Sequence, residues 1–127
     1  MTEFVKEMFK DVIENPVFDE KIVAQYFSRS YIQTVDNRKL DYTDFVNHIK
    51  KLKEKVSVQK VQFLNTAENG TSVFTKHIVK SVLRDNSNIT HKVLAEFVIE
   101  DGKIETCDEL TIMLEGSENE KNLGSEM

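Results

Sequence analysis

The chain has 127 residues, of which 39% are hydrophobic and 31% are charged, and its formal net charge is -5. This length and composition are typical of one globular domain with a single core, and the negative charge argues against nucleic-acid binding, which needs a basic stripe. Cys107 is the only cysteine, so an intrachain disulfide is excluded. We therefore expect a cytoplasmic protein without a signal peptide or a membrane span.

The first part of the chain predicts two helices and a short strand. Apolar residues recur at helical spacing over residues 3–14, and Asn15-Pro16 ends that helix because a residue before proline avoids the α region. Asp19 is a candidate N-cap for a second helix. Residues 30–35 are expected to form a short strand, followed by a tight turn over residues 36–39.

A third helix is predicted after this turn. Asp41 or Thr43 could cap it, and Phe45 and Ile49 belong to its apolar stripe. Its last turns carry a cluster of lysines, namely Lys50, Lys51, Lys53 and Lys55. Because cations are favoured at a helix C-terminus, we interpret the cluster as a solvated helix end, with an anion or partner site as the alternative.

The second half of the chain predicts an antiparallel meander of four strands. The dipeptides Asn69-Gly70 and Asp101-Gly102 indicate hairpins because both tolerate the positive φ angles of tight turns. The strands are expected over residues 57–66, 71–83, 90–100 and 103–114. Residues 1–114 thus form a single domain, and residues 115–127, which have almost nothing to bury, are predicted to be a flexible C-terminal tail.

Helices followed by a meander suggest a curved sheet wrapped around a helical layer, with a pocket between them. Two stretches carry a resemblance to a known family: VAQYFSRSYIQTVDNRKLDYTDFVNHIKKLK, residues 23–53, and HKVLAEFVIEDGKIETCDELT, residues 91–111. Together they resemble the nuclear transport factor 2-like superfamily, and most of all its SnoaL-like branch, which includes polyketide cyclases and has steroid isomerases as relatives. The pattern Phe-x-x-x-Asp-Gly-Lys-Ile, from Phe97 to Ile104, carries the most weight.

The resemblance implies an α+β fold of the cystatin-like type. In that fold a strongly curved, mostly antiparallel sheet wraps around three N-terminal helices and forms a cone-shaped barrel. The resemblance also implies a homodimer joined through the outer face of the sheet, where a partner explains exposed apolar residues better than water does. The residues expected on that face are Leu64, Ile78, Val82, Leu94 and Val98.

The resemblance also allows two reactions to be compared with this sequence. Steroid isomerase chemistry would need a base, a protonated carboxyl and a tyrosine where this chain has Thr34, Ala95 and Phe9, so that reaction is not expected. Polyketide cyclases place an acid shortly after the Asp-Gly-Lys-Ile turn, and Glu109 stands at the matching position. The histidine that often precedes this acid by two residues is replaced here by Cys107.

Glu109 and His77 are the candidate catalytic residues. Glu109 is either a pocket acid or a surface carboxylate, and strand parity, which one bulge would reverse, decides between the two. The other face of its strand is expected to hold Ile104, Leu110, Ile112 and Leu114. His77 lies on an apolar strand face and would be the most useful titrating group of the cavity. The candidate pocket-lining residues are Tyr26, Tyr31, Phe45, His48, Ile49, Phe63 and Phe97.

The remaining residues with reactive side chains predict neither a metal nor another cofactor. His48, His77 and His91 form no close-spaced pair of metal ligands, and a glycine-rich phosphate loop is absent from the sequence. Cys107 lies among acidic residues and is interpreted as a packing residue rather than a nucleophile. Phe74 is placed in the core with most of the aromatic residues, and His91 at a wet strand end.

Two functions stay open at this point. The first is the binding of a small apolar molecule of the carbonyl type, with or without proton transfer of the isomerase or cyclase kind in which Glu109 acts as acid or base. The second is a non-catalytic dimerisation or protein-interaction domain with a vestigial cavity. A pocket of about 300 Å³ or more that contains Glu109 and a histidine would favour the first function.

Overall fold

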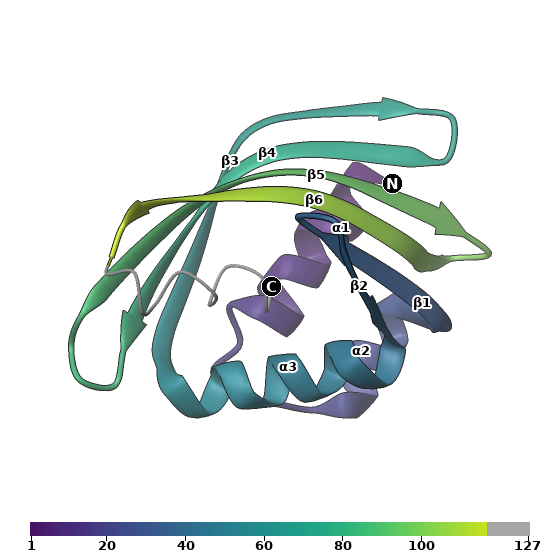
Figure 1. The fold of residues 1–127 in the computed structure, drawn as a ribbon. Helices are drawn as coiled ribbons and strands as arrows, with labels where there is room; N and C mark the ends of the chain where they lie inside the picture. The colour runs from purple at the N-terminus through teal and green to yellow at the C-terminus, as the bar shows by residue number, and fades with distance from the viewer. Residues whose placement is uncertain (117–127) are drawn as a thin grey trace.

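The computed structural model describes residues 1–116, in which helical segments cover one face of a six-stranded sheet (Figure 1). The helical segments are α1 (Thr2–Met8), the π-helical turn η1 (Phe9–Ile13), α2 (Glu20–Tyr26) and α3 (Tyr42–Lys55). The strands are β1 (Phe27–Val35), β2 (Arg38–Asp41), β3 (Val56–Asn69), β4 (Ser72–Leu83), β5 (Asn88–Glu100) and β6 (Lys103–Glu115). The predicted α+β class, with three helices before a meander, is confirmed, because η1 continues α1 without a break.

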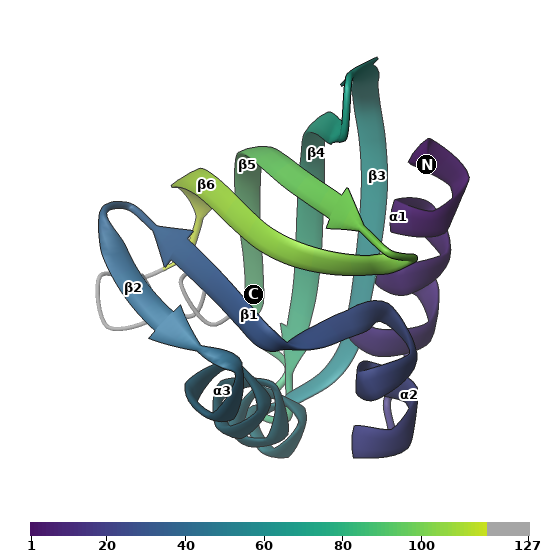
Figure 2. The ribbon, with the colours of Figure 1, turned by 90° about the vertical axis from the view of Figure 1, so that its right-hand side faces the viewer.

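The strands follow the order β2-β1-β6-β5-β4-β3 across the sheet. All neighbouring strands are antiparallel except β1 and β6, which run parallel. The sheet curves, so that its long strands arch over α3 (Figures 1 and 2). Since β2 and β3 are the two edges of this sheet, the predicted cone is an open, strongly curved sheet and not a closed barrel.

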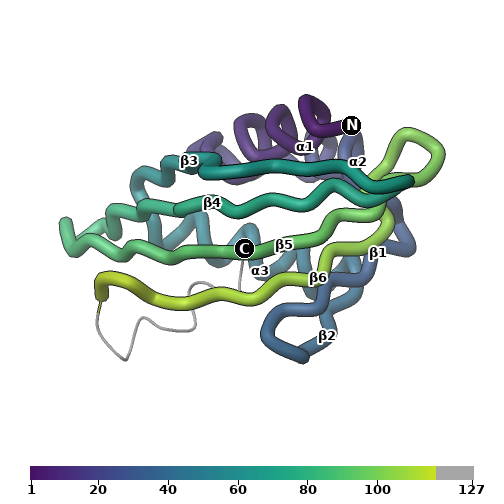
Figure 3. The backbone as a smooth tube through the Cα atoms, turned by 90° about the horizontal axis from the view of Figure 1, so that it is seen from above, coloured from purple at the N-terminus to yellow at the C-terminus, as the bar shows by residue number. Residues whose placement is uncertain are grey.

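The sheet has an inner face, which packs against the helices, and an outer face, which looks away from them (Figure 3). Residues alternate between these faces along each strand. Val73 and Val93, for example, are buried on the inner face, while Leu94 is exposed on the outer face. Phe74 follows the same alternation and is 40% exposed on the outer face, so its predicted place in the core is wrong.

The start of α3 is held by a capping box. The Asp41 carboxylate accepts a hydrogen bond from the Asp44 backbone N–H at 2.8 Å, and the Asp44 carboxylate accepts one from the Asp41 N–H at 3.4 Å. Asp41, and not Thr43, is therefore the cap of this helix. Asp19 caps α2 as predicted, through a 2.9 Å bond from the Lys21 N–H.

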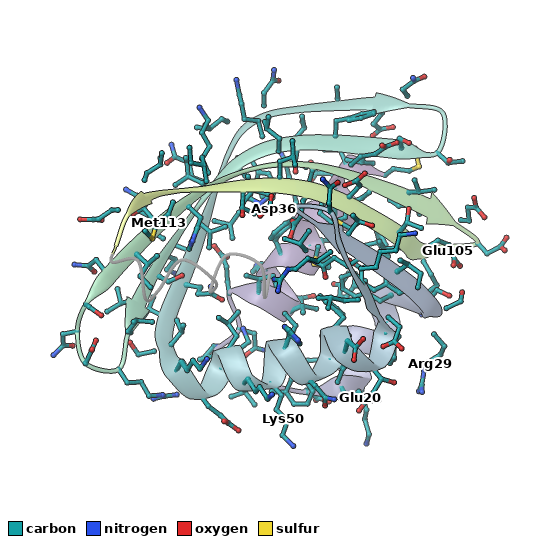
Figure 4. The ribbon with its side chains drawn as sticks, viewed as in Figure 1. Glu20, Arg29, Asp36, Lys50, Glu105 and Met113 are labelled. Atoms are coloured by element: carbon teal, nitrogen blue, oxygen red, sulfur yellow. The ribbon has the colours of Figure 1, made fainter. Side chains whose placement is uncertain are left out.

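The lysine cluster of α3 divides into exposed and buried members. Lys50 points away from the sheet (Figure 4), and Lys51 and Lys55 are exposed as well. Lys53 is buried, and its ammonium group donates a hydrogen bond to the carbonyl of Ile13 at the end of η1. The interpretation as a solvated helix end therefore fails for Lys53, which joins α3 to the first helix.

Several predicted boundaries differ from the structure: β1 begins at Phe27 and not at residue 30, and β3 extends to Asn69, three residues beyond its predicted end. The turn after β1 needs only Asp36 and Asn37, both at positive φ, so residues 38 and 39 belong to β2, a strand that the sequence pattern did not reveal. Glu115 is the last residue of β6, at the point where the tail was expected to begin. The rest of the predicted tail, residues 117–127, lies outside the described residues.

Candidate functional site

Glu109 lies on the inner face of β6 because of a bulge earlier in that strand. Thr106 and Ile104 pair with two consecutive residues of β5, which leaves Glu105 as the extra residue. A bulge of this kind reverses the alternation of faces. Ile104 and Glu109 are consequently both buried, whereas Leu110, Ile112 and Leu114 are exposed, so the prediction that Ile104 shares a face with these three residues is wrong.

The Glu109 carboxyl is enclosed by the protein and is only 4% exposed. The Gln33 side-chain N–H donates a hydrogen bond to its Oε1 at 2.9 Å. Burial raises the pKa of Glu109 from 4.5 to about 8, against the lowering effect of the Gln33 bond, and the negative charges of Asp36 and Asp108 add to the rise. Glu109 is therefore mostly protonated at neutral pH and can donate a proton from an apolar environment.

Tyr31 and Cys107 extend this polar group along β1 and β6. Gln33 pairs with Cys107 in the parallel ladder, and the Tyr31 hydroxyl shares a hydrogen bond with the Cys107 thiol. Burial raises the pKa of both groups well above their ordinary values, so neither ionises near neutral pH. Cys107 thus lacks the thiolate that a nucleophile needs.

An aromatic cluster holds Tyr31 in place. Its ring centroid lies 4.7 Å from that of Phe27 and 4.9 Å from that of Phe45, so the start of α3 packs directly on β1. Ile49, one turn after Phe45, is also buried. His48 is half-buried beside them, and its Nδ1 has no hydrogen-bond partner among the described residues.

His77 lies on the inner face of β4 in a second aromatic cluster. Its ring is 4.8 Å from Phe9 and 5.7 Å from Phe63, and Phe97 lies 5.8 Å from Phe9. The Nδ1 of His77 and the Thr75 hydroxyl are 3.0 Å apart. Burial lowers the pKa of His77 from 6.5 to about 4, so the imidazole is neutral at physiological pH.

The two candidate catalytic residues share the inner face but do not form a dyad. Thr75 pairs with Ala95 of β5, which in turn pairs with Glu109 of β6, so β5 separates the strands of His77 and Glu109. Strands two places apart lie about 10 Å from each other. Gln33, and not His77, is the hydrogen-bond partner of Glu109.

The structure places three further residues differently from the sequence prediction or outside it. Gln33 is a member of the site that sequence reasoning missed, although the alternation Tyr31, Gln33, Val35 in the predicted strand could have placed it on the inner face. Tyr26 is buried on α2, where its hydroxyl donates to the Asp11 carboxylate. His91 was expected to be exposed to solvent, but it is only 1% exposed. Alternate residues of β5 face inward, and His91 is one of them.

A cavity of about 590 Å³ lies on the opposite side of the sheet, along the outer face. Its floor consists of two rows of residues that pair across the strands, and Asn37 of the β1–β2 turn closes one end. The first row is Asn65, Lys76, Leu94 and Leu110, and the second is Ala67, Phe74, Glu96 and Asp108. We call this cavity the outer groove. Neither Glu109 nor a histidine lines it, so it is not the pocket of Glu109 and a histidine that would favour the first function.

Comparison with known proteins places this geometry in a fold family. No family model matches the sequence. An uncharacterized protein of Schizosaccharomyces pombe is 29% identical over 122 residues, which cover 96% of this chain and 93% of that protein. A solved NTF2-like protein of unknown function from Exiguobacterium sp. 255-15 matches with a TM-score of 0.71 at 17% identity, over 86% of this chain and 98% of that one. The chain has the nuclear transport factor 2-like fold.

Other solved structures with similar TM-scores carry enzyme names. A provisionally named polyketide cyclase from Acidithiobacillus ferrooxidans matches with a TM-score of 0.73 at 11% identity, over 86% of this chain and 85% of that one. An LEH-like epoxide hydrolase from M. tuberculosis matches with a TM-score of 0.72 at 13% identity, over 87% of this chain and 80% of that one. These identities are low, so the likeness shows the fold, and the site must carry any argument about activity.

Within residues 1–116, no cluster of three or more His, Cys, Asp or Glu side chains could hold a metal ion. No helix of this part of the chain has the length and apolar run that crossing a bilayer requires.

Proposed function

We propose that the protein binds a small, largely apolar carbonyl compound between the inner face of the sheet and the helices. The observation that carries the proposal is Glu109, a buried carboxyl on the inner face of the sheet that is mostly protonated at neutral pH and is hydrogen-bonded to Gln33. A protonated carboxyl in such a place donates a strong hydrogen bond to a carbonyl oxygen. Cys107, buried and without a disulfide partner, is consistent with a reducing compartment such as the cytoplasm.

The same group would support proton transfer to the bound molecule. In its neutral form Glu109 acts as a general acid toward the carbonyl oxygen, and Gln33, held at 2.9 Å, steadies the carboxylate that results. His77 is neutral and lies on a different strand, so it would shape the apolar end of the site rather than exchange protons with Glu109. The enzyme names of the polyketide cyclase and epoxide hydrolase neighbours support chemistry of this kind without specifying a substrate.

Thermal shift measurements with a set of small aryl and alkyl ketones, acetophenone among them, test the proposal. A ligand that binds only the native state raises Tm by mass action, and the rise should be lost in a Glu109→Met variant. Methyl NMR gives the location of the bound ketone, because Val73 and Val93 lie on the inner face while Leu94 and Leu110 lie on the outer face. Shifts confined to the two leucines, or no shift of any methyl group at saturating ketone, would refute an inner site.

A second function, self-association through the outer face, is favoured by a separate observation. The outer groove is lined by exposed apolar side chains, among them Leu110 at 59% exposure. The face is also charged unequally, since Lys60, Lys80 and Lys92 lie toward one end and Glu96 and Asp108 toward the other. Two copies related by a two-fold axis would bring these unlike ends together over a shared apolar centre.

Sedimentation velocity tests this second proposal. The wild-type chain should sediment as a dimer at micromolar concentration, and Leu110→Glu should convert it to a monomer by placing a charge at the apolar centre. Val17→Glu is the matched control, because Val17 is 66% exposed but lies outside the sheet. A wild-type monomer, or a Val17 variant that dissociates as readily as the Leu110 variant, would contradict it.

A further inference from the structure

The outer groove has room for a small molecule and offers it apolar surface. Its volume of about 590 Å³ lies within the range of roughly 300–1,000 Å³ that ligand pockets have. Phe74, Leu94 and Leu110 line it, and all three side chains are exposed. A ligand that covers these side chains removes apolar surface from water, which favours binding.

Two carboxylates lie side by side in the floor of the groove. Glu96 of β5 pairs with Asp108 of β6, so the Cβ atoms of the two residues are about 5 Å apart. Like charges directly across a pair of strands repel each other. Within residues 1–116 neither carboxylate forms an ion pair with a lysine, an arginine or a histidine. A cation in the groove would therefore relieve the repulsion.

The surroundings of Glu96 also suit a cation. The Ser72 hydroxyl donates a hydrogen bond to Glu96 Oε2 at 2.6 Å, and this bond orients the carboxylate. Phe74 is the partner of Glu96 on β4, while Asp108 is its partner on β6, so Glu96 lies between an aromatic ring and a second acid. The π face of a ring attracts cations.

The two rows of the floor fix the orientation of such a ligand. Leu94 and Leu110 belong to the first row, and the two carboxylates to the second, about 7 Å away along the strands. Lys76 lies in the first row beside Leu94 and would repel a cation there. Since the groove holds two carboxylates and one ammonium group, a cationic ligand fits it better than an anionic one.

We propose that the outer groove binds a small organic cation, namely a protonated amine with an apolar chain or ring. The ammonium group lies between Glu96 and Asp108, and the apolar part covers Leu94 and Leu110. This inference goes beyond the proposed function, because it concerns an amine on the outer face and not a carbonyl compound on the inner face. A bound amine and a second copy of the chain would compete for the same surface.

Phenethylamine and phenethyl alcohol form a matched pair of probes, since they have the same number of heavy atoms and differ by exchange of an ammonium for a hydroxyl group. Binding of each is measured by titration of the Leu94 and Leu110 methyl signals, with those of Val73 and Val93 as inner-face references. At low salt we expect the amine to bind roughly tenfold more tightly than the alcohol. Sodium chloride at about 0.5 M should reduce this preference by screening exposed charges.

Variants without the two carboxylates assign the preference to them. Glu96→Gln and Asp108→Asn together should weaken amine binding to the level of the alcohol and leave the affinity for the alcohol unchanged. Glu54→Gln is the matched control, because it removes an exposed carboxylate from α3, on the other side of the sheet, and should leave amine binding unchanged.

Three results would overturn the inference. They are equal affinities of the two probes for the wild-type chain, an amine preference that survives the double variant, and no shift of the Leu94 and Leu110 signals at saturating amine. In the third case, a dimer in sedimentation velocity would show that a second copy occupies the groove instead. None of these results bears on the inner site, which acetophenone and the Val73 and Val93 signals test separately.

Discussion

Burial controls the charge of the two candidate residues and leaves both neutral near pH 7. The folded chain raises the pKa of Glu109 from 4.5 to about 8, so it keeps a proton that the unfolded chain releases. The contribution of Glu109 to the free energy of unfolding is therefore lost as pH rises from 4.5 to 8. The folded chain lowers the pKa of His77 from 6.5 to about 4, so stability from the imidazole is instead lost as pH falls from 6.5 to 4.

Below pH 6.5 the titrations of Glu109 and His77 change the free energy of unfolding in opposite directions. Between pH 6.5 and 8 only the titration of Glu109 contributes. Between pH 6.5 and 8 the free energy of unfolding should decrease by up to about 1.4 kcal/mol per pH unit. Glu109→Gln, which keeps the shape but cannot ionise, should remove this decrease. Urea unfolding across that range measures the effect, and identical slopes for the two proteins would show that Glu109 does not titrate there.

His77 is tested best in the Glu109→Gln background, where the opposing titration is absent. As pH falls from 6.5 toward 4, this background should lose stability because the unfolded chain takes up a proton that the buried imidazole refuses. Adding His77→Gln should reduce the acid loss, as followed by thermal unfolding at several pH values. If the loss of stability between pH 6.5 and 4 is the same with and without His77→Gln, groups other than His77 cause it.

At the scale of elements, the sequence predicted those features that have local causes. The hairpins at Asn69-Gly70 and Asp101-Gly102 appear as expected, since Gly70 and Gly102 take positive φ. The bulge at Glu105 has no local signature, yet it decides which residues of β6 face the helices. Gln33 was overlooked because its role depends on parallel pairing of β1 with β6, a contact between residues far apart in the chain.

The capping box of α3 gives a prediction at this scale. Asp41→Ala removes the acceptor for the Asp44 N–H and should cost about 1 kcal/mol of stability. Thr43→Ala, two residues later and also exposed, is the control and should cost much less. Chemical unfolding at pH 7 compares the two variants; an equal loss would mean that the cap does not hold this helix.

For the whole molecule, one sheet serves two proposed roles on its two faces. Glu109 points inward and Leu110 outward, so neighbouring residues of β6 belong to different sites. The nuclear transport factor 2-like fold could be predicted from the order of elements and from the resemblance, while the outer groove could not. Its two rows arise from the register of four strands, which no single stretch of sequence encodes.

The two faces should consequently be separable by mutation. Leu110→Glu is expected to abolish self-association and to leave acetophenone binding at the inner methyl groups within about twofold of the wild-type value, because the two side chains lie on opposite sides of the sheet. Sedimentation and NMR titration on the same variant measure both properties. A variant that loses both together would indicate a single site shared by two copies.

The central claim is that the fold keeps Glu109 protonated on the inner face of the sheet. The most direct measurement is a pH titration of the Glu109 side-chain carboxyl carbon by NMR, assigned with the Glu109→Gln variant. We predict a midpoint at about pH 8. A midpoint near 4.5, the ordinary value for a glutamate in water, would contradict the account.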